Sequence, residues 1–212
     1  MRILYAIQNV GGIDFTHDIG DTVPVKHSLV GLQRAGHHVD CLQLDGNRVG
    51  LIRDVTYPDR LNTASLGLSG TKPFHLLEGA LRRFQSVLNI PYFAFFDSFR
   101  FYEACSRLAH GYDLIHEHNG LFCLGAARAS VKLKAPYVLT FSADPIMERE
   151  LVGKPLKGMH AWVGRKEARY TYQAARRILC VSEPAKLHLV ETWGVEARKI
   201  VVMPNGVDTQ LF

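Results

Sequence analysis

Short apolar runs alternate with helical segments along most of this chain, and this alternation limits the possible folds more than any other feature. Residues 3–10 form the first run. After a polar loop, Val25, Leu29 and Leu32 follow at i, i+4 and i+7, the spacing of one helical face. Gly36 suits the C-terminal cap of that helix. The first third of the chain therefore begins with a predicted strand and a predicted helix.

Further strand-like runs continue the alternation. The second strand is predicted at 39–44, and four more short runs follow at 114–116, 137–141, 178–181 and 200–203. Each of these four except the last precedes a plausible helix. In a sequence, strands that are covered by helices on both faces appear as continuous apolar runs. The sequence therefore predicts an α/β fold, a Rossmann-like parallel sheet with helices on both faces.

Composition excludes several classes of protein. With 212 residues, 47% hydrophobic and 21% charged, the chain is long enough to bury a core, and one large domain is expected. No run reaches the roughly 18 apolar residues of a membrane span, and the first ten residues lack the features of a secretory signal. We therefore expect a soluble, cytoplasmic protein. The four cysteines are scattered without a CxxC pair, so neither disulfides nor a structural zinc site is expected.

The net charge suggests an anionic partner but does not select one. The formal charge is +5 and the pI is about 9.1. A phosphate-bearing substrate, nucleic acid or an acidic lipid surface fits this charge. An ordinary solvated basic surface fits it equally well.

One insertion, at about 46–110, interrupts the alternation and shows no clear strand. A Gly/Ser/Thr-rich loop at 62–73 precedes a segment, 74–110, that is helical in period and dense in aromatic residues. In one interpretation, two helices pack onto the sheet with Pro91 between them. In the other, part of the insertion is an exposed acceptor-binding or membrane-surface patch. That interpretation places three arginines near acidic headgroups, namely Arg82, Arg83 and Arg100.

Polar and turn-forming residues follow each predicted strand. In an open parallel sheet, ligands bind at the carboxyl ends of the strands. The Gly11-Gly12 pair lets a backbone approach a phosphate. No GxGxxG or GxxxxGK[ST] motif accompanies the pair, which excludes nicotinamide-cofactor and P-loop sites. The other groups at this edge are 116–119, 142–144, 182–184 and 204–208.

Two histidines at i and i+2 share one face of the third core strand. A metal site at His116 and His118 needs further ligands, which the sequence does not supply. His116 is interpreted either as a buried, hydrogen-bonded residue or as part of the site. His118 is a candidate for substrate contact or acid–base chemistry.

The residues after the next two strands have alternative interpretations. Asp144, with Ser142 beside it, either orients or deprotonates a substrate hydroxyl, or caps the following helix. Ser182 suits a helix N-cap. Asn205-Gly206 is a turn signal in any protein.

Together, these segments resemble a known family. They are similar to the N-terminal half of the retaining glycosyltransferases of the GT-B fold in the GT4 group. The resemblance covers the chain except the insertion at about 46–110. The segments that carry it are MRILYAIQNVGG, LVGLQRAGHHVDCL, YDLIHEHN, APYVLTFSAD, ARRILCVSEPAKLHLVETWGV and KIVVMPNGVDTQLF.

The resemblance implies a domain organisation. In the family, the NGVD segment closes the last strand of the N-terminal domain, and a second Rossmann-like domain then binds most of the nucleotide-sugar. We therefore expect 1–212 to be a single, acceptor-side GT-B domain that lacks the C-terminal donor-binding domain and is inactive alone.

The resemblance also implies site residues. Gly11 and Gly12 are expected to meet the donor diphosphate or the acceptor, and His118 to line the cleft near the acceptor. Ser142 stands where many relatives have a histidine that faces the reacting sugar. Either Asp144 or His118 takes over the contacts of that histidine, or the acceptor differs. The other expected donor- or acceptor-binding residues are His116, Asn119, Asn205 and Gly206.

The implied activity is retaining transfer of a sugar from a nucleotide-sugar to a hydroxyl of a glycan, a lipid-linked molecule or a small molecule. The departing donor phosphate helps to deprotonate the acceptor, so cationic and amide groups matter more than a protein nucleophile. No DxD motif is present, and neither a metal nor a cofactor is expected. Nucleic acid is not an expected partner, whereas peripheral contact with the anionic inner face of a membrane is. The alternatives are half of a nucleotide-sugar epimerase and a non-catalytic module that binds a glycan or a partner.

Overall fold

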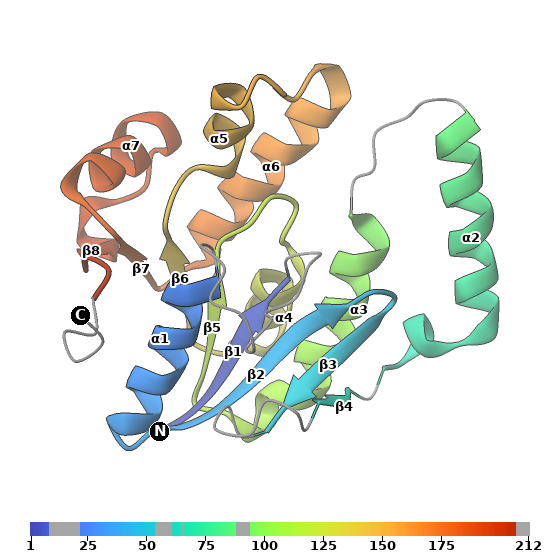
Figure 1. The fold of residues 1–212 in the computed structure, drawn as a ribbon, viewed down its shortest axis with the longest axis horizontal. Helices are drawn as coiled ribbons and strands as arrows, with labels where there is room; N and C mark the ends of the chain where they lie inside the picture. The colour runs from blue at the N-terminus through green and yellow to red at the C-terminus, as the bar shows by residue number, and fades with distance from the viewer. Residues whose placement is uncertain (9–21, 54–60, 65, 88–93, 207–212) are drawn as a thin grey trace.

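A central sheet organises the protein (Figure 1). The structure, a computed structural model, describes residues 1–8, 22–53, 61–64, 66–87 and 94–206. In this part of the chain the sheet has eight strands in the order β4-β3-β2-β1-β5-β6-β7-β8. Their bounds are Arg2–Ile7 (β1), His38–Asp45 (β2), Arg48–Ile52 (β3), Leu61–Thr63 (β4), Leu114–His118 (β5), Tyr137–Phe141 (β6), Arg177–Cys180 (β7) and Ile200–Val202 (β8).

Six of the described strands are parallel, and two at one edge are not. β1 pairs in parallel with β2 and β5, and the parallel order continues through β6, β7 and β8. β3 runs antiparallel to β2 and to β4. The predicted parallel sheet is therefore confirmed for these six strands, whereas the prediction of an insertion without a clear strand was wrong. The missed signal is Gly46-Asn47: Gly46 has a φ of 54°, and this dipeptide joins Asp45 to Arg48 in a tight hairpin.

Helices cover both faces of the sheet, as predicted. On one face, Ile3 and Tyr5 of β1 pack with Val25 and Leu29 of α1. On the other face, a larger hydrophobic cluster joins α3, α4, α6 and α7 to the strands. Figure 1 shows α1 in front of the sheet and α4 behind it. The helix bounds are Thr22–Arg34 (α1), Lys72–Val87 (α2), Phe95–Leu108 (α3), Gly125–Leu133 (α4), Pro145–Leu151 (α5), Gly158–Ala174 (α6) and Glu183–Trp193 (α7).

Helix caps occur where the sequence predicts them. Gly36, just after α1, has a φ of 80°, and the amide of His37 donates to the carbonyl of Leu32 at 3.1 Å. The hydroxyl of Ser182 accepts from the amide of Ala185 at 3.3 Å at the start of α7. Both capping predictions are confirmed.

The two helices of the insertion have different environments. α3 contributes Phe101, Ala104 and Cys105 to the main core. All residues of α2 are described, and Glu78 is the one that is buried. Figure 1 shows α2 beside the rest of the protein rather than on the sheet. The prediction that both helices pack onto the sheet is therefore correct for α3 and wrong for α2, and Pro91 lies outside the described residues.

The expected exposure of the insertion's arginines also needs correction. Arg100 is fully buried, and Arg82 forms ion pairs with Glu78 and Asp97. Of the three arginines, Arg83 lies exposed on α2. Across the described residues, no helix combines the length and hydropathy that spanning a bilayer requires.

The close approach of α3 and α4 depends on Gly125. A Cβ atom there would lie 2.7 Å from the carbonyl oxygen of Ser98, 2.8 Å from the Phe101 Cβ and 2.8 Å from the amide of Tyr102. We expect Gly125→Ala to lower the free energy of unfolding by about 2 kcal/mol, because the two helices must separate. Gly31→Ala in α1 is the control: its Cβ meets nothing within 4 Å, and it should stabilise the protein by up to about 1 kcal/mol. Urea unfolding measures both, and equal changes would contradict the prediction.

Candidate functional site

The carboxyl ends of the parallel strands meet at one edge of the sheet. In the register, Ala6 of β1 is opposite Glu117 of β5, and His118 of β5 is opposite Thr140 of β6. The strands therefore end within a few residues of one another. Gln8, Asn119 and Ser142, which follow β1, β5 and β6, consequently emerge at the same edge, as the sequence predicts.

Gln8 is a residue at this edge that sequence reasoning missed. Its side chain is buried, and Nε2 donates to the Ser98 hydroxyl at 2.6 Å and to the Phe122 carbonyl at 3.0 Å. Its Oε1 accepts from the amide of Gly125 at 2.9 Å. Gln8 thereby joins the end of β1 to α3 and to the start of α4. The available signal was an amide side chain just beyond a buried apolar strand.

Gly11 and Gly12, which follow Gln8 along the chain, lie outside the described residues. Their assignment to the donor or acceptor stays a prediction.

His116 is buried and hydrogen-bonded. Its Nε2 lies 2.7 Å from the Thr140 hydroxyl, and its ring packs against Tyr5 with the centroids 4.6 Å apart. Burial, reinforced by the neighbouring His118, lowers the pKa of His116 to about 4. The side chain is therefore neutral at pH 7. This arrangement confirms the interpretation of His116 as a buried, hydrogen-bonded residue, and its contact with a ligand stays a prediction.

Glu117 lies on the opposite face of β5 from His116 and is also buried. The hydroxyl of Tyr137 donates to its Oε2. Burial raises the pKa of Glu117 to about 8, although the hydrogen bond from Tyr137 acts in the other direction. Two adjacent residues of one strand therefore hold an uncharged imidazole and a protonated carboxyl group at pH 7. The sequence did not single out Glu117.

His118 and Asn119 form the carboxyl end of β5. His118 is half-buried and is the last residue in the pairing of this strand with β6. The amide of Asn119 donates to the Thr140 carbonyl at 2.9 Å, and its Nδ2 donates to the Ala143 carbonyl at 3.2 Å. Asn119 thus joins the end of β5 to the turn that follows β6, which places His118 beside that turn.

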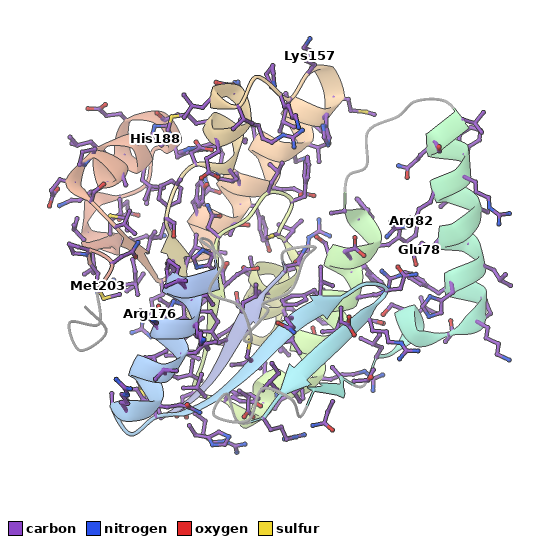
Figure 2. The ribbon with its side chains drawn as sticks, in the orientation of Figure 1. Glu78, Arg82, Lys157, Arg176, His188 and Met203 are labelled. Carbon is purple, nitrogen blue, oxygen red and sulfur yellow. The ribbon has the colours of Figure 1, made fainter. Side chains whose placement is uncertain are left out.

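Asp144 caps α5 and accepts hydrogen bonds from two elements. Its Oδ1 accepts from the amides of Ile146 at 2.8 Å and Met147 at 3.4 Å. Its Oδ2 accepts from His188 Nε2 and from Trp193 Nε1, both at 2.8 Å. Figure 2 labels His188 on α7, whose residues the sequence did not connect with this turn. The N-cap interpretation is confirmed. These four bonds use the usual acceptor capacity of a carboxylate, so contact with a substrate requires exchange of one of them.

The other candidates have fewer contacts. Ser142 is half-buried between the end of β6 and the cap at Asp144. Asn205 and Gly206 are exposed beyond β8 at the same edge. Across the described residues, no three His, Cys, Asp or Glu side chains gather as metal ligands would. The expectation of a site without metal stays a prediction.

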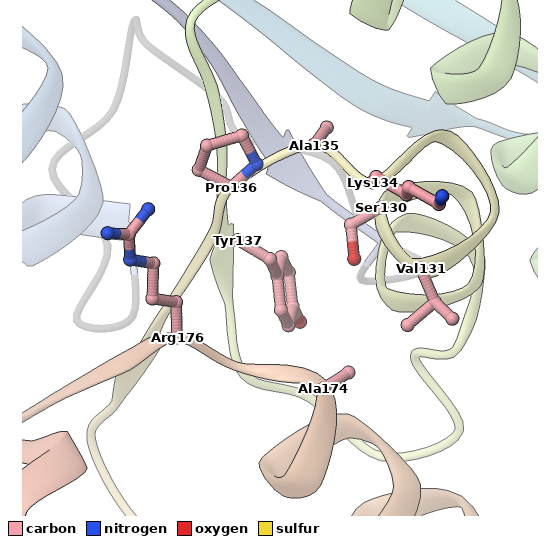
Figure 3. Close-up of a pocket in the computed structure, with 8 residues that line it drawn as sticks. All are labelled: Ser130, Val131, Lys134, Ala135, Pro136, Tyr137, Ala174 and Arg176. Atoms are coloured by element: carbon pink, nitrogen blue, oxygen red, sulfur yellow. The ribbon is translucent and has the colours of Figure 1, made fainter.

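Two pockets lie away from the carboxyl ends of β5 and β6. One, of about 260 Å³, lies at the amino end of β6, where Figure 3 shows Tyr137 and Arg176 among its lining residues. The other, of about 400 Å³, is lined by residues of α3, α4 and α6. Ser98, one of its lining residues, is also a partner of Gln8. The second pocket therefore contacts, through Ser98, the network at the end of β1.

Comparison with protein-family models gives one match. The family model described as Glycosyltransferase Family 4 matches residues 25–211. The chain belongs to Glycosyltransferase Family 4. The resemblance noted from the sequence motifs is therefore confirmed, although 1–24, with Gly11 and Gly12, falls outside the matched range. No curated protein matches this Family 4 chain.

Solved structures show the same fold. HepE of Anabaena in complex with UDP and glucose has a TM-score of 0.55 and 17% identity, over 100% of this Family 4 chain and 46% of HepE. UDP-GlcNAc 2-epimerase of Neisseria meningitidis bound to UDP-GlcNAc has a TM-score of 0.53 and 10% identity, over 97% of this chain and 47% of the epimerase. The chain thus spans about half the length of these proteins. The predicted Rossmann-like half of a GT-B fold is confirmed.

Proposed function

We propose that this domain is the acceptor-binding part of a retaining glycosyltransferase, which moves a sugar from a nucleotide-sugar to a hydroxyl acceptor. The observation that carries the proposal is the Family 4 match over residues 25–211. The edge where His118, Asn119 and Ser142 emerge supports it, because ligands of parallel α/β sheets bind at this edge. The complexes of HepE with UDP and of the epimerase with UDP-GlcNAc favour a uridine nucleotide in the donor.

The donor and the acceptor are assigned to different parts of the GT-B fold. Because the chain aligns with 46% of HepE, we assign most of the nucleotide to the part of the fold beyond the aligned half. Residues 1–212 alone are therefore expected to be inactive. We assign the protein to the cytoplasm, where nucleotide-sugars serve as substrates. The proposed enzyme uses neither a resident metal nor a cofactor, and it has no nucleic-acid partner.

We assign His118 and Ser142 as the residues whose side chains contact the reacting groups of the donor and the acceptor. His118 ends β5 beside the turn that carries Ser142, and both are half-buried. In the proposed reaction the donor phosphate departs and accepts the proton of the acceptor hydroxyl, so the protein orients the acceptor rather than forming a bond to the sugar. Asp144, through its bonds to α5 and α7, is assigned as the positioning residue of this turn.

The remaining residues are assigned to binding. Gly11 and Gly12 supply backbone amides to the donor diphosphate or the acceptor, and Asn119, Asn205 and Gly206 contact the same ligands at the cleft rim. His116 contributes indirectly, because its bond to Thr140 fixes the end of β6.

A transfer assay with the intact protein that contains this domain tests the proposal. We expect sugar from a uridine-linked donor to reach a hydroxyl acceptor with retained anomeric configuration, which NMR of the product reports. Donor turnover without any acceptor would instead favour the epimerase alternative, whose fold-level support is the Neisseria enzyme. Donor binding without either reaction would favour a non-catalytic module.

His118→Ala is expected to lower the turnover number of that intact protein by about 10²-fold, because the acceptor loses an orienting group. The melting temperature should change little, since the side chain is half-buried rather than part of the core. His110→Ala is the matched control, because His110 is exposed in the turn that precedes β5, at the opposite edge of the sheet. Equal turnover for His118→Ala and His110→Ala would contradict the assignment.

A further inference from the structure

Helix α2 has its polar side turned inward and its apolar side turned outward. Glu78 and Arg82 are one turn apart and, as Figure 2 shows, lie on the side of α2 that faces α3. The outward part of α2 carries apolar residues with exposed fractions between 41% and 83%. A surface helix of a globular protein normally has the reverse orientation. The exposed apolar residues, called the α2 face below, are Leu76, Leu77, Leu81, Phe84 and Val87.

A buried charge cluster fixes this orientation. Arg100 of α3 is fully buried, pairs with Glu78, and donates from Nη1 to Asp97 Oδ1 at 2.8 Å. Arg82 Nη2 lies 2.7 Å from Glu78 Oε1 and 3.4 Å from Asp97 Oδ1. Phe74, one turn before Glu78, lies with its ring 5.8 Å from the Arg100 guanidinium. Rotation of α2 to bury its leucines would break the contacts that cross between the two helices, namely Glu78–Arg100, Arg82–Asp97 and Phe74–Arg100.

A second anchor holds the segment before α2. The carboxylate of Glu103 in α3 accepts hydrogen bonds from the amides of Gly67, Leu68 and Ser69 and from the Ser69 hydroxyl. Burial would raise the pKa of Glu103, but these donors lower it, and the net direction is downward, so the carboxylate is ionised at pH 7. Both the entry to α2 and its inner side are therefore fixed, and the α2 face is the outward side of a held helix.

The charges beside the α2 face have one sign. Lys72 at the start of the helix and Arg83 in its middle are exposed. The single acidic residue of α2 is Glu78, which is buried in the cluster. A helix with an outward apolar face and exposed basic residues has the character of helices that lie in the interface of an anionic bilayer.

We propose that the α2 face docks on an anionic lipid surface, with its leucines and Phe84 in the headgroup region and Lys72 and Arg83 near lipid phosphates. A second copy of the chain is a poorer occupant. Two α2 helices packed together would bring their lysines and arginines close without any exposed acidic partner on either helix. The proposal is independent of sugar transfer, because lipid binding is measured without donor or acceptor.

Co-sedimentation of the purified chain with vesicles tests the proposal. The vesicles contain phosphatidylcholine alone or with about 30% phosphatidylglycerol, at low salt and at about 0.5 M salt. Binding is expected for the anionic vesicles at low salt, and weaker binding at high salt. The triple variant Leu77→Gln/Leu81→Gln/Phe84→Gln should bind at least about tenfold more weakly, since glutamine preserves helix propensity but not apolar area.

A charge variant and a matched control complete the experiment. Arg83→Glu should also lower the affinity about tenfold, because it replaces an exposed cation by an anion and leaves the buried cluster intact. Trp162→Gln is the control, since Trp162 is 63% exposed on α6, away from α2. Circular dichroism should show the same helix content for every variant.

Several results would overturn the proposal. One is failure of the chain to sediment with anionic vesicles at low salt, and another is retention of the original affinity by both the triple variant and Arg83→Glu. Loss of binding in Trp162→Gln alone would place the contact on α6. A dimer that the triple variant abolishes, with unchanged vesicle affinity, would make a second copy the occupant of the α2 face.

Discussion

Between pH 4.5 and pH 8, the unfolding free energy of Glu117→Gln is expected to rise by about 4 kcal/mol relative to that of the unsubstituted protein. Burial raises the pKa of Glu117 from 4.5 to about 8, so the folded state keeps a proton that the unfolded state has lost. The stability from this group is complete below pH 4.5 and is lost as the pH rises through 8. The amide that Glu117→Gln introduces does not titrate, and it still offers Tyr137 an oxygen to donate to.

The neighbouring His116 is expected to act in the opposite direction. Burial lowers the pKa of His116 from 6.5 to about 4. The stability that His116 contributes to the folded protein is therefore complete above pH 6.5 and is lost as the pH falls through 4. Relative to the unsubstituted protein, His116→Gln should therefore lose about 3 kcal/mol as the pH rises from 4 to 6.5. In the unsubstituted protein, the contributions of Glu117 and His116 to the pH dependence of the unfolding free energy largely cancel between pH 4.5 and pH 6.5.

Urea unfolding at a series of pH values, followed by circular dichroism, measures both difference curves. Glu191→Gln, which replaces an exposed carboxylate of α7, is the control for the loss of one acidic side chain. Flat curves for both Glu117→Gln and His116→Gln would show that neither group titrates differently in the folded and unfolded states.

Arg100→Met is expected to lower the unfolding free energy by about 3–5 kcal/mol. The substitution removes a fully buried guanidinium and leaves Glu78 and Asp97 paired with Arg82, which is partly exposed. The effect should concentrate in α2, because this cluster and Phe74 provide the contacts that hold its inner side. Hydrogen exchange of the α2 amides should accelerate more than exchange in α4.

Two comparisons separate this mechanism from general damage. Arg83→Met, one residue from Arg82 but exposed, should change stability by less than about 0.5 kcal/mol. The double variant Glu78→Met/Arg100→Met should be more stable than Arg100→Met alone, because it also removes a buried carboxylate that has lost its buried partner and keeps only the partly exposed Arg82. A double variant that loses the sum of the two single losses would show that Glu78 and Arg100 are not coupled.

Much of the fold follows from short stretches of sequence. The apolar runs of β1, β2 and β5–β8 and the helical period of α1 are properties of neighbouring residues, so the alternation predicted the parallel sheet and its helical layers. Gly36 follows the end of α1 and Ser182 precedes the start of α7, as predicted. A helix cap depends on hydrogen bonds within a few residues, so the sequence is sufficient to predict it. The position of the candidate site follows in the same way, since parallel strands place their loops at one edge.

Features that depend on distant contacts were not predictable in this way. Glu78 and Arg100 are 22 residues apart, and their pairing turns the apolar side of α2 outward although the period of α2 alone indicates an ordinary amphipathic helix. Asp144 reads as a helix cap, but its bonds to His188 and Trp193 join residues 44 and 49 positions away.

The sequence by itself determined the α/β layers, the family and the edge of the sheet that carries the candidate site. The tertiary structure decided the antiparallel β3 and β4, the outward face of α2 and the environments of His116 and Glu117. A period of two places these two residues on opposite faces of β5, but burial of both faces depends on α1 and on α3 and α4, which distant segments supply. Local periodicity determines on which face of the strand a side chain lies, whereas packing between distant segments determines which residues cover that face.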